Sequence, residues 1–170
     1  MQIDNNFQTP FFVCEYMVSL IKDEPEIKTV LEPTPGQGRL ALVLKKNRYN
    51  VLLPYPDPNN FWNFILADHK YYAEWNAIVM NPPATPMKKA YDIFYKCMEH
   101  TDRIVALMPW LTIINSQKRT KDIMDFGLIS VTHLPRSTFP GSRIQTCILN
   151  MKRGYKSKTE FKMIGHGIEG

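Results

Sequence analysis

Two loops of the sequence combine residue types that could hold a small ligand and a reactive amine. Asn81, Pro82 and Pro83 directly follow the apolar residues 77–80. The two prolines remove two amide donors and keep the backbone extended, so the carbonyl oxygens of this loop need partners from outside it. Together with the amide oxygen of Asn81 they form a cluster of acceptors that suits an amino group. A structural strand terminator accounts for the same residues equally well.

The second loop, residues 32–38 with the sequence EPTPGQG, follows another short apolar segment. Gly36 and Gly38 tolerate a positive φ and have no Cβ, so a ligand can approach the backbone closely. The helix expected to follow would offer its N-terminal amides to a polar ligand group. Considered alone, this pair of glycines is explained as well or better by a tight strand-to-helix turn.

The segments that position these loops alternate between strand and helix. Thr9 can cap the first helix, and Pro10 suits its first position. Because the middle strands are apolar on both faces, the pattern predicts an α/β fold with a mostly parallel sheet and helices on both faces. Strands are expected at 28–32, 49–53, 64–66, 77–80, 103–108, 128–134 and 144–151, and further helices at 39–46, 86–100 and 116–126.

In combination, the motifs carry a family resemblance. The chain shows Thr9-Pro10, then the loop 32–38, then a strand ending at Asp68, then a hydrophobic strand running into Asn81. This order resembles the S-adenosylmethionine-dependent adenine-N6 DNA methyltransferases in which the cofactor motifs precede NPP, and it covers residues 7–153. The resemblance implies a Rossmann-like class I methyltransferase fold, with a mostly parallel seven-stranded sheet and an antiparallel last strand. It also implies an enzyme of restriction–modification.

The resemblance implies a role for each matching residue. Asn81, Pro82 and Pro83 would receive the target amine, whose nitrogen attacks the sulfonium methyl group with little acid–base chemistry. Glu32 would lie near the cationic amino group of the cofactor. The cofactor, S-adenosylmethionine, would be bound by Thr9, Pro10, Glu32, Pro33, Gly36, Gly38, Asp57 and Asp68. A base flipped out of the duplex would contact Ala84, Trp110, Phe139, Arg136 and Arg143.

The sequence departs from the family pattern at four places. Ala84 occupies the position of an aromatic residue that stacks on the flipped base, a contact worth roughly 1–3 kcal/mol. Asn76 replaces an acidic residue before the NPP strand. Asp57, the remaining candidate for the ribose contact, lies among prolines. The second and third strands are so close in sequence that the helix usually found between them is expected to be missing.

The chain is predicted to contain a methyltransferase core at residues 1–152 and a short basic tail at 153–170. No separate target-recognition domain follows the last expected strand, so DNA reading is expected to need a recognition subunit or a homodimer. Residues 86–170 carry 14 Lys/Arg against 7 Asp/Glu, whereas residues 1–85 carry 7 against 9. A basic half suits phosphate contacts with DNA, although an ordinary solvated surface would show the same charge.

Other features limit the range of functions. Cys14, Cys97 and Cys147 are odd in number and far apart, which argues against a disulfide framework and a zinc site and favours a cytoplasmic protein. No apolar stretch reaches the roughly 18–20 residues of a membrane span. Two alternatives remain open. One is methylation of an RNA or protein amine, and the other is a non-catalytic methyltransferase-like module that binds nucleic acid or a partner.

Overall fold

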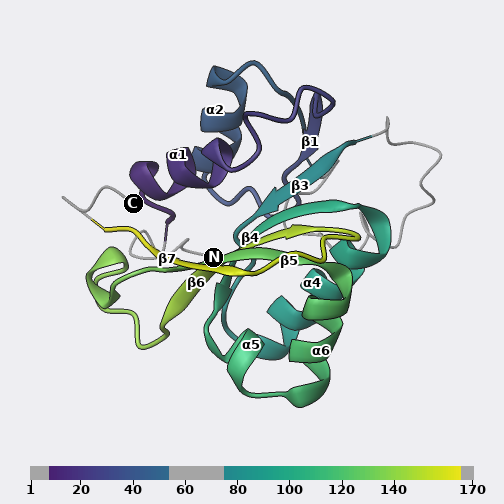
Figure 1. Ribbon diagram of the computed structural model, residues 1–170. Helices are drawn as coiled ribbons and strands as arrows, with labels where there is room; N and C mark the ends of the chain where they lie inside the picture. The colour runs from purple at the N-terminus through teal and green to yellow at the C-terminus, as the bar shows by residue number, and fades with distance from the viewer. Residues whose placement is uncertain (1–7, 54–74, 166–170) are drawn as a thin grey trace.

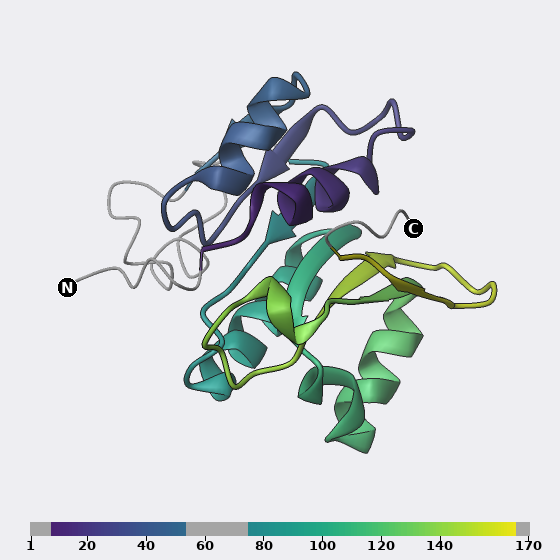
Figure 2. The same ribbon diagram turned by 90° about the vertical axis from the view of Figure 1, so that its left-hand side faces the viewer.

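The computed structural model describes residues 8–53 and 75–165. The strands form a single sheet in the order β2-β1-β3-β4-β6-β5-β7. Helices α1 and α2 lie on one face of this sheet, and α4, α5 and α6 lie on the other (Figures 1 and 2). The elements are α1 Phe11–Ser19, β1 Thr29–Leu31, α2 Arg39–Lys46, β2 Asn50–Leu52, β3 Ala77–Met80, α4 Met87–His100, β4 Arg103–Pro109, α5 Leu111–Ile114, α6 Gln117–Phe126, β5 Leu128–His133, the 3₁₀ helix η3 Arg136–Thr138, β6 Thr146–Lys152 and β7 Glu160–Met163.

Six of the seven strands that the structure describes share one direction. β2, β1, β3 and β4 pair in parallel. β6 is antiparallel to both of its neighbours, β4 and β5, and β7 is parallel to β5. The predicted α/β fold, with a mostly parallel seven-stranded sheet and an antiparallel strand at 144–151, is therefore confirmed.

The membership of the sheet differs from the prediction at one strand. β7 lies within the segment 153–170, for which the sequence predicts only a basic tail. All four residues of β7 are exposed, so its alternating sequence EFKM marks no buried face, and its pairing with β5 supplies its backbone partners. The predicted strand at 64–66 lies outside the described residues, as does the question of a helix between the second and third strands.

Two hydrophobic cores, one on each face, hold the layers together. On the α1 and α2 face, Met17 and Leu44 pack with Val79 from β3. On the other face, Phe94 and Ile123 from the helices pack with Ile78 and Met80, among others. All four residues of β3 and all seven of β4 are buried. Both strands contribute side chains to both cores, which explains the uninterrupted apolar runs at 77–80 and 104–109.

The start of α1 corrects one prediction. Pro10 occupies the N-cap position rather than the first helical position, and no side chain caps the helix. Thr9 is therefore one residue too early to reach the first-turn amides. Its hydroxyl group instead accepts a hydrogen bond from the side chain of Asn81, 2.7 Å away. In contrast, α2 and β3 have the predicted bounds.

Gly127 links α6 to β5 in a backbone conformation that a side chain would obstruct. Its φ is +130°, and a Cβ built there would lie 2.1 Å from the carbonyl oxygen of Lys152. That carbonyl belongs to β6, and the amide of Lys152 donates to the Gly127 carbonyl at 3.0 Å. The backbone of the α6–β5 turn thus packs directly against the sheet.

We expect Gly127→Ala to lower the free energy of unfolding by at least about 3 kcal/mol, because backbone strain and a backbone clash act together. Urea unfolding followed by circular dichroism measures the change. Gly154→Ala is the matched control: its φ is +83° but nothing lies within 4 Å of the added Cβ. We expect this control substitution to lower the free energy of unfolding by about 1 kcal/mol. Equal losses in the two variants would contradict the packing argument.

Candidate functional site

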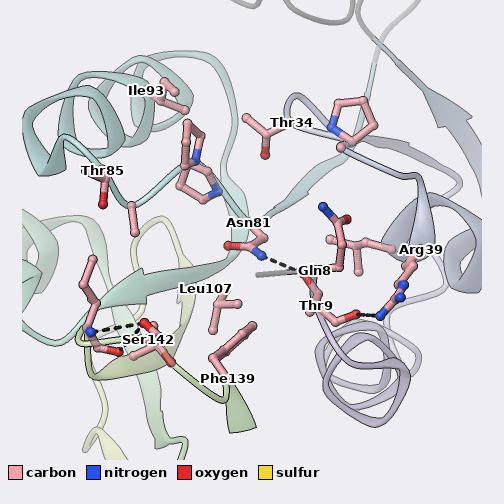
Figure 3. A pocket seen from close by; sticks show the side chains of 18 of the residues that line it. Gln8, Thr9, Thr34, Arg39, Asn81, Thr85, Ile93, Leu107, Phe139 and Ser142 are labelled. Carbon is pink, nitrogen blue, oxygen red and sulfur yellow. Dashed lines mark hydrogen bonds between the residues drawn. The ribbon is translucent and has the colours of Figure 1, made fainter. Parts of the chain in front are cut away.

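A cavity of about 930 Å³ lies where β1, β3 and β4 reach their carboxyl ends. The two loops singled out in the sequence form opposite parts of its wall, and the loop between β5 and β6 closes it from a third direction (Figure 3). The cavity is lined by Gln8, Thr9, Glu32, Pro33, Thr34, Pro35, Gly36, Arg39, Leu40, Asn81, Pro82, Pro83, Ala84, Thr85, Lys89, Ile93, Leu107, Phe139, Gly141, Ser142, Arg143, Ile144 and Thr146.

Asn81 is fixed in the cavity wall by a contact across 72 positions of sequence. Its amide nitrogen Nδ2 donates to the hydroxyl oxygen of Thr9 at 2.7 Å, and Figure 3 shows the two side chains pointing at each other. This bond sets the amide orientation. Within the part of the chain that the structure describes, the amide oxygen Oδ1 has no partner, so it is left as an acceptor in the cavity.

Glu32 is a carboxyl group at a nearly dry position in the wall. It is 1% exposed and accepts two hydrogen bonds at Oε1, from the amide of Thr34 at 2.9 Å and from its hydroxyl at 3.3 Å. Burial raises the pKa of Glu32 to about 8, and the two bonds from Thr34 offset only part of that effect. A cation placed in the cavity would therefore be attracted to Glu32 and would favour its ionised form.

The glycine loop adopts the conformation expected from its sequence. Gly36 has a φ of +52° and Gly38 a φ of +80°, both in the left-handed region. A Cβ on Gly36 would lie 3.4 Å from the side-chain oxygen of Gln8. Gly36 thus allows the loop to approach the segment before α1, while Gly38 forms the N-cap of α2.

Among the described residues that line the cavity, Phe139 is the aromatic one. It follows η3 and is 7% exposed, with Leu107 beside it (Figure 3). Ala84 lines the cavity from the NPP loop and offers only a methyl group. The aromatic surface available to a flat ligand therefore comes from the β5–β6 connection.

Trp110 lies apart from this wall. Its indole nitrogen donates to Nδ1 of His133 at 2.9 Å, and its ring packs near Phe161 of β7, with centroids 5.9 Å apart. These contacts are at the end of β4, on the side of the sheet that carries α5. Trp110 does not line the cavity because β5 and β7 hold it beside them.

The structure brings together ten of the predicted site residues around one cavity. Four others are described but are not among the lining residues: Pro10, Gly38, Trp110 and Arg136. Asp57 and Asp68 lie outside the described residues. The sequence analysis missed several lining residues, of which Arg39 carried a usable signal because it directly follows the glycine loop. The other polar residues missed are Gln8, Thr34, Thr85, Lys89, Ser142 and Thr146.

The described residues contain neither a metal-binding cluster nor a membrane-spanning helix. No group of three or more His, Cys, Asp or Glu side chains lies close enough together there to hold a metal ion. No helix within residues 8–53 and 75–165 has the length and apolarity needed to cross a membrane.

The raised pKa of Glu32 predicts a dependence of stability on pH. The pKa of this carboxyl is about 8 in the folded state and 4.5 in the unfolded state. It does not lower the free energy of unfolding below pH 4.5, because both states are protonated there. Its destabilising effect is largest above pH 8. We therefore expect the free energy of unfolding of Glu32→Gln to rise relative to that of the parent as pH increases through this window. The full difference, reached above pH 8, should be roughly 3–5 kcal/mol. Urea unfolding at a series of pH values measures the difference, with exposed Glu15→Gln as control. Parallel stability curves for parent and Glu32→Gln would contradict the prediction.

Comparisons with known proteins bear on the fold. The sequence matches no protein-family model and no curated protein. Its structure is similar to a modification subunit assigned to a type I restriction enzyme of Vibrio vulnificus YJ016, with a TM-score of 0.69 and 18% identity over 93% of this chain and 47% of that one. It is also similar to a type I restriction-modification methyltransferase subunit from Streptococcus thermophilus, with a TM-score of 0.67 and 14% identity over 93% and 47%.

A third similar structure is a Listeria monocytogenes protein described as a class I S-adenosylmethionine-dependent methyltransferase, with a TM-score of 0.62 and 15% identity over 96% of this chain and 66% of that one. The chain spans about half the length of the two type I subunits. The resemblance drawn from the sequence is confirmed at the level of structure. The chain therefore has the class I S-adenosylmethionine-dependent methyltransferase fold.

Proposed function

We propose that the chain is an S-adenosylmethionine-dependent methyltransferase that acts on an amino group of nucleic acid, with adenine N6 in DNA as its substrate. The observation that carries the proposal is the position of Asn81. Its amide oxygen is an uncommitted acceptor in the wall of the same cavity that contains buried Glu32. An acceptor for an amine thus lies beside a subsite for a cation, which is the arrangement that transfer from a sulfonium to an amine requires.

The residues of the cavity fit the proposed cofactor. Glu32 would bind its ammonium group, and Thr9, Pro33 and Gly36 would line its methionine portion. A volume of about 930 Å³ is large enough for the cofactor together with a base. When bound, S-adenosylmethionine supplies an electrophilic methyl group. Asp57 and Asp68 remain proposed contacts to its ribose and adenine.

The NPP loop would act on the target amine through hydrogen bonds. The Oδ1 atom of Asn81 would accept one amine hydrogen and the carbonyl oxygen of Pro82 the other, with Pro83 keeping the loop extended. Holding both hydrogens turns the nitrogen lone pair out of conjugation with the ring and toward the methyl group. Because Thr9 already fixes the Asn81 amide, little reorganisation is needed at the moment of transfer.

The substrate side of the cavity has both an aromatic and a basic element. Phe139 would stack on an extrahelical base, and Ala84 leaves space on the opposite side. Arg143 and Lys89, which line the cavity, would contact the flanking phosphates, and Arg136 lies in η3 of the same connection. Specific reading of DNA would come from a partner: a recognition subunit or a second copy of the chain.

We expect Asn81→Ala to lower methyl transfer at least about 100-fold, because one acceptor for the amine is lost, while the dissociation constant for S-adenosylmethionine stays within about 3-fold. Transfer of a labelled methyl group to genomic DNA measures the first quantity and calorimetry the second. Exposed Asn115→Ala is the matched control. Equal loss of transfer and cofactor binding would show that Asn81 is structural. Parent protein that binds the cofactor yet methylates neither DNA, RNA nor protein would favour the non-catalytic module.

We expect Ala84→Tyr to tighten binding of single-stranded DNA containing 2-aminopurine by roughly 5- to 100-fold, since the added ring supplies a base-stacking contact. Fluorescence quenching of the 2-aminopurine measures the contact. The same strand with an abasic site in place of the base is the control, and its affinity should not change. Equal gains for both strands would mean that the tyrosine contacts the backbone and does not stack on the base.

A further inference from the structure

Arg39 is a cation in the cavity for which the preceding proposal has no role. It is the first residue of α2, and its side chain is among the lining residues. Cys14 lies within range of both Arg39 and Glu32. The pKa of its thiol is raised to about 12, chiefly by burial and in part by the Glu32 charge, while the Arg39 charge lowers it. The cavity therefore holds a carboxyl group and a guanidinium group around one location.

The donors of Arg39 are largely uncommitted. Nη1 donates to the carbonyl oxygen of Thr9 at 3.5 Å, the upper limit for a hydrogen bond, and Figure 3 shows the side chain reaching toward that residue. The guanidinium carbon lies 5.5 Å from the ring centroid of Phe11. Among the residues that the structure describes, Nε and Nη2 have no hydrogen-bond partner. A guanidinium with two unused donor nitrogens in a cavity wall is suited to a carboxylate.

The start of α2 also favours a negatively charged ligand group. No side chain caps this helix, and its first turn contains no acidic residue. Its first-turn amides are therefore open to an external acceptor, and the helix dipole places partial positive charge there. Leu40, the next residue, also lines the cavity, so this end of the helix faces it.

We propose that Arg39 binds the carboxylate of an α-amino-acid group whose ammonium binds Glu32, and that it thereby selects the intact methionine end of the cofactor. This inference rests on the proposed function. It explains why a buried carboxyl and an arginine with uncommitted donors occur together: each neutralises one half of a zwitterion. The Thr9 carbonyl then orients the guanidinium, while the Thr9 hydroxyl orients Asn81, so one residue aligns the cofactor end with the amine acceptor.

The test compares S-adenosylmethionine with its decarboxylated analogue, which keeps the sulfonium, the ammonium and the nucleoside. Calorimetry gives the dissociation constants of both ligands for the parent chain, for Arg39→Met and for Arg39→Lys. Arg48→Met is the control, because it removes the same charge just beyond the other end of α2, at an exposed position. Free methionine is titrated separately to ask whether the amino-acid group binds without the nucleoside.

We expect the parent to prefer the intact cofactor by about 10- to 100-fold, because charge-assisted bonds to the carboxylate are lost in the analogue. Arg39→Met should abolish this preference, Arg39→Lys should retain part of it, and Arg48→Met should leave it intact. The ratio of the two constants cancels any general loosening of the Thr9 segment. A preference that survives in Arg39→Met overturns the role of Arg39 alone. Failure of the folded parent to bind either ligand overturns the proposed function as well.

Discussion

Parallel pairing of β1 with β3, and of β3 with β4, is the constraint on which the rest of the molecule depends. Leu31 pairs with Ile78, and Met80 pairs with Ala106, so the strands end at the same edge of the sheet. Each strand is buried on both faces, and its loop is therefore the first place where polar groups can leave the core. Glu32 and Asn81 reach one cavity for this reason, although 49 positions separate them in the sequence.

Thr9 is positioned by the local structure at the start of α1 and also takes part in long-range hydrogen bonds. Pro10 takes the N-cap of α1 and leaves the Thr9 side chain without a helical role. Its hydroxyl and its carbonyl are then bound from two different elements, by Asn81 and by Arg39. A segment at the beginning of the described chain thereby joins the NPP loop to the start of α2. Polar groups on both sides of the cavity are oriented before any ligand enters, which is the basis of preorganised binding.

Two departures from the family pattern have different physical consequences. Asn76 accepts backbone hydrogen bonds from Lys28 and Thr29 at 2.9 and 3.0 Å, so its amide oxygen completes the start of β1 without a carboxylate. Ala84 has no such compensation on its own loop, and Phe139 contributes an aromatic side chain to the cavity from the β5–β6 connection. The first substitution therefore preserves the scaffold, whereas the second changes how a base could be held.

Short sequence motifs determined those parts of the protein whose backbone conformation depends on neighbouring residues in the chain. Glycines that need a positive φ, paired prolines and uninterrupted apolar runs predicted α2, β3 and the two loops, together with ten of the residues around the cavity. Only the tertiary structure decided the rest. β7 is held in the sheet by backbone pairing with β5, Trp110 is kept away from the cavity by its bond to His133, and Thr9 meets Asn81 because segments 72 positions apart converge. Such contacts join residues distant in sequence, so no local pattern encodes them.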